Sequence, residues 1–202
     1  MNYELTNDQT NALNEINKDL KSEEKMFRLL QGDVGSGKTI VALISCLNVV
    51  NSGYQVAFMA PTEILAHQHY KLAQSLIKDK MKIGFLTSKT DYSERKKIIN
   101  DLETSKLNIL FGTHSVFQEK ISYKKLGLVV IDEQHKFGVK QRKKLSDKGG
   151  KNCDVLVMSA TPIPRTMIMT VFGDMDVSII KQKPKNRKPV KTYSKVCLLY
   201  TS

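Results

Sequence analysis

The chain has 202 residues, 41% of them hydrophobic, which is enough apolar material for the core of one ordinary domain but would leave a second complete domain cramped. Thirty-two basic and twenty acidic side chains leave a net charge of +12, which favours polyanions: nucleic acid first, anionic membrane surfaces second. No apolar run reaches the roughly eighteen residues of a membrane span, and the first residues lack the regions of a signal peptide, so we expect a cytoplasmic protein.

Apolar runs alternate with helical patterns along the chain. Short apolar runs of this kind are typical of strands that are buried on both faces of a sheet. They cover residues 27–31, 55–60, 82–86, 107–112, 126–132 and 154–159. Between them, apolar residues recur at helical spacing over 38–50, 63–77 and 91–103. The alternation predicts an α/β fold, in which a mostly parallel sheet has helices on both faces and binds ligands at the carboxyl ends of its strands.

A glycine-rich segment, GDVGSGKT, follows the first of these strands and precedes the first of these helices. Its spacing is that of a P-loop, in which glycines let backbone N–H groups converge on phosphate oxygens at the start of a helix. Lys38 should reach the β- and γ-phosphates of ATP, and the Thr39 hydroxyl should bind Mg²⁺. The alternative is an ordinary glycine-rich turn, which the flanking strand and helix disfavour. The residues expected to bind the nucleotide are Gly32, Gly35, Ser36, Gly37, Lys38 and Thr39.

Two carboxylates stand at the end of the predicted strand 126–132. Asp132 and Glu133 lie at the edge where a parallel sheet holds its ligands. Phosphoryl transfer to water needs a carboxylate that holds the metal ion and a second group that positions or activates the water. We therefore expect Asp132 to act through Mg²⁺ and Glu133 to act on the water. His135 is a lone histidine, which is usually structural, although its place after the acid pair favours a functional role.

Five segments carry a resemblance to a known family. They are GDVGSGKT (32–39), APTEILA (60–66), GTHSVFQE (112–119), VVIDEQHKFGVKQR (129–142) and MSATPIPRT (158–166). In this order they resemble the first motor lobe of superfamily 2, DExH-type DNA helicases of the RecG type, over nearly the whole chain. The resemblance implies a RecA-like P-loop fold, ATP and Mg²⁺ as cofactors, and branched DNA such as forks and Holliday junctions as the partner, without a membrane.

The resemblance also implies roles for residues around the nucleotide. Gln9, in the segment LTNDQ, is a candidate for reading the adenine edge, and the alternative is an exposed glutamine at the start of a helix. Ser159 and Thr161 would couple hydrolysis to movement on DNA, and His135 would relay between them and the hydrolysis site. Plain hydroxyls at the end of a strand are the alternative for these two residues.

Further residues are expected to face DNA. Thr62 and Thr113 would offer hydroxyls and neighbouring backbone N–H groups to DNA phosphates. Arg165 either contacts DNA or pairs with an acidic group inside the lobe. His67 and His69 are two residues apart in a helical pattern, so they face different sides and are expected at the surface or in the core, not as a metal pair.

The motifs match one motor lobe, whereas RecG-type helicases carry a wedge domain and two lobes. We expect residues 1–180 to form the ATP-binding lobe and 181–202 to form a basic linker or exit strand with a truncated tail. Without the wedge domain and the second lobe, which supplies an arginine finger, the lobe should bind nucleotide and hydrolyse it poorly. The alternatives are a transcription-repair coupling factor-type lobe, which Gln134 disfavours, and a nucleotide-switched module that binds DNA or a partner without turnover.

Overall fold

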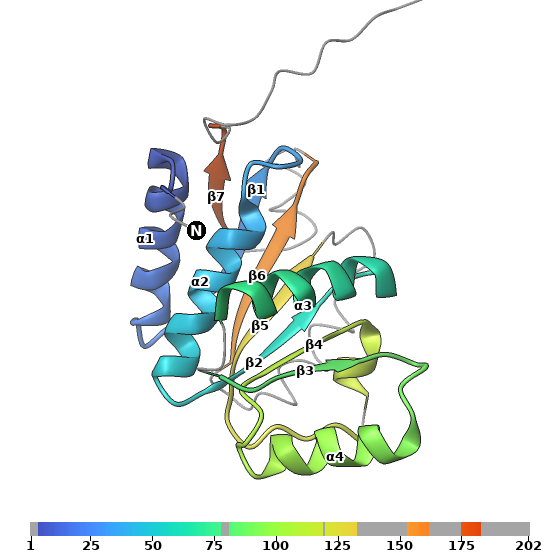
Figure 1. The fold of residues 1–202 in the computed structure, drawn as a ribbon. Helices are drawn as coiled ribbons and strands as arrows, with labels where there is room; N and C mark the ends of the chain where they lie inside the picture. The colour runs from blue at the N-terminus through green and yellow to red at the C-terminus, as the bar shows by residue number, and fades with distance from the viewer. Residues whose placement is uncertain (1–3, 78–80, 119, 133–152, 162–174, 183–202) are drawn as a thin grey trace, which may run out of the picture.

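The computed structural model describes residues 4–77, 81–118, 120–132, 153–161 and 175–182. Within these residues, seven strands form one sheet in the order β3-β4-β2-β5-β6-β1-β7, and every strand pairing is parallel (Figure 1). The strands are β1 (Phe27–Gly32), β2 (Gln55–Met59), β3 (Ile83–Leu86), β4 (Ile109–Gly112), β5 (Leu126–Asp132), β6 (Asp154–Ser159) and β7 (Asp176–Ile180). The carboxyl ends of all these strands therefore lie along one edge of the sheet.

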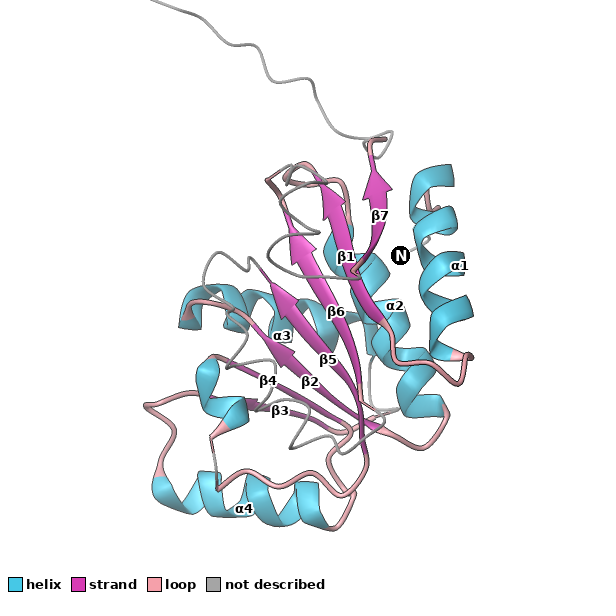
Figure 2. Ribbon diagram, turned by 180° about the vertical axis from the view of Figure 1, so that it is seen from behind, coloured by secondary structure: helices cyan, strands magenta, loops and turns pink. Residues whose placement is uncertain are grey.

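Helices cover both faces of this sheet (Figure 2). They are α1 (Asn7–Leu20), α2 (Lys38–Asn51), α3 (Glu63–Ile77), α4 (Tyr92–Glu103) and the 3-10 helix η2 (His114–Phe117). The first three pack into one apolar cluster and the last two into another. No helix in the described part of the chain is long and apolar enough to span a membrane.

The strands divide their side chains between the two clusters. β2 is buried along its whole length, with Val56 and Phe58 in the cluster beneath α2 and α3, and Ala57 and Met59 in the cluster beneath α4. Burial on both faces is what makes such strands read as unbroken apolar runs. The predicted parallel α/β sheet and its six apolar strands are therefore confirmed.

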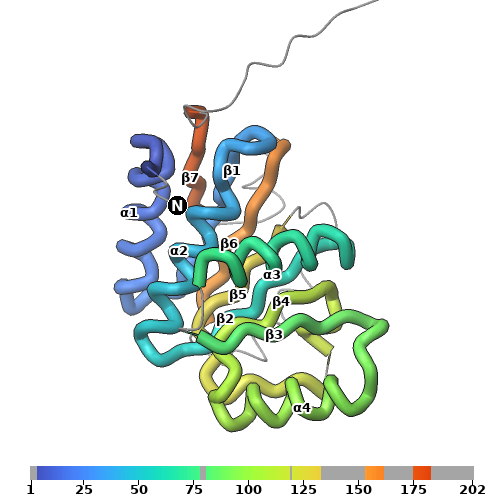
Figure 3. The backbone as a smooth tube through the Cα atoms, in the orientation of Figure 1, coloured from blue at the N-terminus to red at the C-terminus, as the bar shows by residue number. Residues whose placement is uncertain are grey.

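Helix α1 and strand β7 were not among the elements expected from the apolar runs. Helix α1 begins with a capping box, in which Thr6 Oγ1 accepts a hydrogen bond from Gln9 N and Gln9 Oε1 accepts one from Thr6 N. Strand β7 pairs with β1 at the edge of the sheet. The tube view in Figure 3 shows that α1 and β7, from opposite ends of the described chain, lie side by side.

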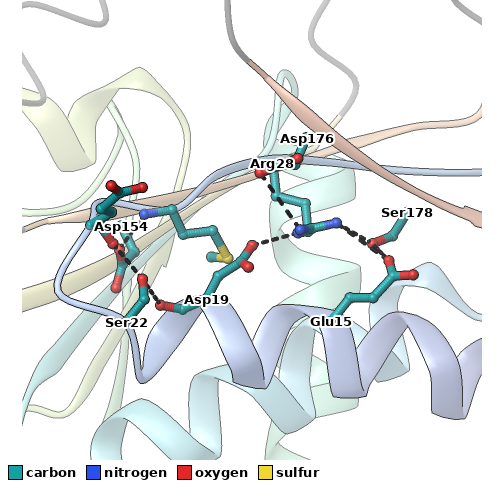
Figure 4. Close-up of polar contacts among 9 residues, drawn as sticks. Glu15, Asp19, Ser22, Arg28, Asp154, Asp176 and Ser178 are labelled. Atoms are coloured by element: carbon teal, nitrogen blue, oxygen red, sulfur yellow. Dashed lines mark hydrogen bonds and ion pairs between the residues drawn. The ribbon is translucent and has the colours of Figure 1, made fainter.

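A buried arginine joins these two elements to β1 (Figure 4). Arg28 is 8% exposed, and its Nε donates to Asp19 Oδ2 of α1 at 2.6 Å. Its Nη1 donates to Glu15 Oε2 at 3.3 Å and to Ser178 Oγ of β7 at 3.0 Å. Its Nη2 lies 3.7 Å from Asp176 Oδ2. One guanidinium thus contacts α1 and β7 at once, and the charge is paired where it is buried.

Candidate functional site

The turn between β1 and α2 has the backbone of a phosphate-binding loop. It starts at Gly32, the last residue of β1, and ends at Lys38, the first residue of α2. Gly35 and Gly37 have φ values of 75° and 89°, in the left-handed region that favours glycine. A Cβ atom on Gly37 would also lie 2.2 Å from Gln9 Nε2. The torsion angle therefore favours glycine at this position, and a larger residue would also displace the Gln9 side chain.

Lys38 and Ser36 hold polar groups inside this loop. The Lys38 side chain is buried, and its Nζ donates to Gly32 O at 2.6 Å and Asp33 O at 3.1 Å. Ser36 Oγ is buried and has no hydrogen-bond partner among the described residues. A buried hydroxyl without a partner costs free energy, so a site that keeps one has donor capacity for a ligand. Thr39, in the first turn of α2, is half-buried beside them.

Gln9 belongs to the same site. Its side chain is 4% exposed, so the expected alternative of an exposed glutamine at a helix start is wrong. Gln9 Nε2 donates to Ser36 O at 2.7 Å, which ties the start of α1 to the phosphate-binding loop. The role of Gln9 in reading adenine stays a prediction.

Asp132 lies at the carboxyl end of β5, where it is 8% exposed. Strand β6 separates β5 from β1, and Asp132 is paired in register with Met158 of β6. Because neighbouring strands are about 4.8 Å apart, β5 and β1 are separated by about 10 Å. A metal ion and the phosphates of a nucleotide fit between a carboxylate and a loop at this separation.

His69 is a site residue that sequence reasoning missed. Its Nε2 lies 2.6 Å from Asp132 Oδ2, and both side chains are buried. Two helical turns hold it in place, since Ala66, His69 and Ala73 share the buried face of α3. His67 is exposed, so the two histidines do face different sides as expected. The helical period was the available signal, because it places His69 on the same helix face as Ala66 and Ala73 and so indicates that it is buried.

The Ser159 and Thr161 hydroxyls meet at the end of β6, between β5 and β1. Ser159 Oγ lies 3.0 Å from Thr161 Oγ1, and Thr161 N donates to Ser159 Oγ at 3.2 Å. Ser159 is buried and Thr161 is exposed. The turn after β6 therefore runs from a buried position at the carboxyl edge of the sheet to the surface. The coupling role of the two residues stays a prediction.

The residues expected to face DNA lie farther along the same edge. Thr62 is exposed between β2 and α3, where its carbonyl oxygen accepts from Ala66 N at 3.0 Å. Thr113 follows β4, the neighbour of β2, and its Oγ1 lies 3.4 Å from Ser115 Oγ. Three expected site residues, Glu133, His135 and Arg165, lie outside the described residues.

Comparison with known proteins identifies relatives of this chain. A family described as DEAD/DEAH box helicase matches residues 6–170. The ATP-dependent DNA helicase RecG of Aquifex aeolicus is 51% identical over 192 residues, which are 94% of this chain and 24% of that protein. The RecG of Streptococcus pneumoniae is 49% identical over 190 residues, which are 94% of this chain and 28% of that protein.

A solved structure shares both the sequence and the fold. The structure of RecG bound to a three-way DNA junction matches with a TM-score of 0.81 and 44% identity, over 94% of this chain and 25% of that one. The chain thus spans about a quarter of the length of these relatives. The fold and the family resemblance expected from the sequence motifs are confirmed.

Proposed function

Because this chain belongs to the DEAD/DEAH box helicase family, we propose that it is the ATP-binding motor lobe of a RecG-like DNA helicase. The observation that carries the proposal is one sheet edge on which a phosphate-binding loop with a buried lysine and a strand-end aspartate lie about two strand spacings apart. The reaction is hydrolysis of ATP to ADP and phosphate, coupled to movement on DNA.

The residues of this edge suit ATP with a magnesium ion. Lys38 would exchange its hydrogen bonds to loop carbonyls for bonds to the β- and γ-phosphates, and Ser36 Oγ has donor capacity inside the loop. Thr39 and Asp132 offer the oxygen ligands that Mg²⁺ prefers. The ion, when bound, neutralises charge that develops on the phosphates during transfer. Glu133 would position and activate the attacking water.

Branched DNA is the proposed partner of the complete protein. A RecG relative has been solved on a three-way junction, and its motor lobe shares this fold. In this chain Thr62, Thr113 and Arg165 would contact the DNA backbone, while Ser159, Thr161 and His135 would couple those contacts to hydrolysis. A wedge domain and a second motor lobe would act in the same chain, in the cytoplasm of a bacterium, during DNA repair and recombination.

The binding of nucleotide to this lobe is the first test. A fluorescent ATP analogue should bind the chain in the presence of Mg²⁺, and Lys38→Ala should abolish that binding, because the phosphates lose their buried cation. Lys71→Ala removes an exposed lysine from α3 and is the matched control. Equal binding by wild type and Lys38→Ala would remove the phosphate-binding role of this loop.

The catalytic assignment needs the complete enzyme. In a two-lobe protein, Glu133→Gln should keep ATP affinity while losing DNA-stimulated turnover, since only the activation of water is affected. Turnover measured on forked and linear duplexes would also test the preference for branched DNA. Unchanged turnover in the variant would show that Glu133 is not the base.

A further inference from the structure

The contact between His69 and Asp132 has no role in the assignments above. An ionised carboxylate can only accept hydrogen bonds, so the proton of this 2.6 Å contact lies on His69 Nε2, which donates to Asp132 Oδ2. Among the described residues, Oδ1 of Asp132 has no hydrogen-bond partner. One oxygen of the carboxylate is therefore held by His69, while the other has no partner in the described part of the chain.

The histidine ring is itself fixed by packing. Its centroid lies 5.0 Å from that of Phe58 on β2, at a tilt of 45°. Phe58 in turn stacks on Phe111 of β4, with centroids 5.1 Å apart. Phe58 and Phe111 are fully buried, so α3 presents the ring to Asp132 from a rigid support.

We propose that His69 is a positioning residue for the metal-holding carboxylate of Asp132. The proposal rests on the proposed function, because it assumes that Asp132 serves the Mg²⁺ ion of ATP. By holding Oδ2, His69 would fix the rotamer of Asp132 at a strand end that lies about two strand spacings from the phosphate-binding loop. Groups that hydrogen-bond a metal ligand in this way usually change metal affinity by about 10- to 100-fold when removed.

The variants should separate the hydrogen bond from the packing of the ring. His69→Phe keeps an aromatic ring against Phe58 and removes the N–H donor. His69→Gln brings an amide N–H to about the reach of Nε2, whereas His69→Asn is shorter and cannot reach Asp132. His67→Phe, on the exposed side of the same helix, is the matched control.

The readout is metal binding instead of turnover. Mn²⁺, which takes the same oxygen ligands as Mg²⁺, is titrated into the full chain with a non-hydrolysable ATP analogue and followed by electron paramagnetic resonance. His69→Phe and His69→Asn should weaken Mn²⁺ binding by about 10-fold or more, and His69→Gln should restore most of it. His67→Phe should bind Mn²⁺ like the wild type.

Two results would overturn the proposal. One is Mn²⁺ affinity in His69→Phe equal to that of the wild type, and the other is equal Mn²⁺ affinity in His69→Gln and His69→Asn, since only the first can make the hydrogen bond. Analogue binding measured in EDTA separates this failure from that of the proposed function. A wild-type chain that binds no analogue fails as a nucleotide-binding lobe, whereas analogue binding that is the same in every variant leaves that function intact.

Discussion

The two ends of the parallel sheet differ in whether a buried polar side chain has hydrogen-bond partners. At the amino end, Gln55 Nε2 donates to Leu102 O and Leu107 O, both at 2.9 Å, and its Oε1 accepts from Lys125 N at 3.0 Å. At the carboxyl end, Ser36 Oγ is buried without a partner among the described residues. The polar groups of Gln55 are thus satisfied by the chain, whereas Ser36 at the carboxyl end keeps capacity for a ligand.

This difference separates stability from function within one fold. A substitution at the amino end removes a partner that the folded chain already uses, so it should lower the free energy of unfolding and leave nucleotide affinity unchanged. A substitution at the carboxyl end should lower nucleotide affinity more than stability. Each prediction below measures one or both of these quantities, and together the predictions test the division.

Gly37→Ala should have the largest effect. The new Cβ would lie 2.2 Å from Gln9 Nε2, and the backbone at 37 has a φ of 89°. Backbone strain of about 1–3 kcal/mol, together with displaced loop amides, should reduce the affinity for a fluorescent ATP analogue by about 100-fold or more. The measurement is an anisotropy titration in the presence of Mg²⁺.

Gly53→Ala is the matched control for this prediction. Gly53 has a φ of 84°, nearly the same as Gly37, but nothing lies within 4 Å of an added Cβ, and the residue follows α2 at the amino end of the sheet. The variant should lose about 1 kcal/mol of stability from the strained backbone and bind the analogue normally. Equal affinity in both variants would contradict the comparison.

Arg28→Met should produce the largest loss of stability. The side chain keeps its length but leaves Asp19 and Glu15 without their cation, and Asp19 is only 20% exposed. Removing one partner of a buried ion pair costs about 3–5 kcal/mol, and we expect the lower end because Glu15 is half exposed. Urea unfolding of Arg28→Met, alone and with Asp19→Asn, measures this loss and its partial recovery.

An exposed pair supplies the control for Arg28. Lys89 Nζ lies 3.1 Å from Glu63 Oε2, but the Lys89 side chain is 80% exposed. Lys89→Met should therefore change stability by less than about 1 kcal/mol. A similar loss for Lys89→Met and Arg28→Met would show that the burial of Arg28 adds nothing.

Gln55→Met should lower stability by a smaller amount. The substitution preserves the length of the side chain and leaves Leu107 O and Lys125 N without the partner that Gln55 supplies, whereas Leu102 O still accepts from Ser105 N at 3.1 Å. Unpaired buried groups cost about 1–3 kcal/mol each, and relaxation of the loop should limit the total to about 2–3 kcal/mol. Gln68→Met, on the exposed face of α3, is the control. A lower nucleotide affinity in Gln55→Met would contradict the expectation that substitutions at the amino end affect stability alone.

Sequence alone was sufficient where the site is local. The phosphate-binding loop is one continuous segment between a strand and a helix, so its glycine spacing specifies the backbone directly. Asp132 was identified for a similar reason, because it ends an apolar run in a fold that holds ligands at strand ends. The structure confirms the placement of both at one edge of the sheet.

Elements that depend on distant partners were missed. His69 and Asp132 are 63 residues apart, and only the packing of α3 on β2 brings them together. Strand β7 is a short edge strand with two of its five residues exposed, so it lacks the apolar run by which the other strands were found. For α1 the capping signal was present in Thr6 and Gln9, although the helix has few buried residues.

Asp154→Asn should have the smallest effect, and its sign depends on pH. Asp154 Oδ1 accepts a hydrogen bond from Met26 N at 2.8 Å, at the start of β6 (Figure 4). Burial raises the pKa of Asp154 above its ordinary value of 3.8, although the Met26 hydrogen bond opposes this, and the nearby Asp19 raises the pKa further. The folded state therefore binds a proton more readily than the unfolded state does.

The stability contributed by protonated Asp154 should be fully present below its ordinary pKa and lost as the pH rises through the raised value in the folded state. At neutral pH the wild type holds a partly buried charge there, whereas an asparagine Oδ1 accepts the same bond without one. Asp154→Asn should thus be slightly more stable than the wild type at pH 7, and the difference should shrink as the pH falls toward 4. Urea midpoints at several pH values measure this, with the exposed Asp91→Asn as control. A stability gain of Asp154→Asn that does not change with pH would show that the charge of Asp154 is not its cause. The wild-type hydrogen bond at the amino end of β6 would then be less favourable than its geometry indicates.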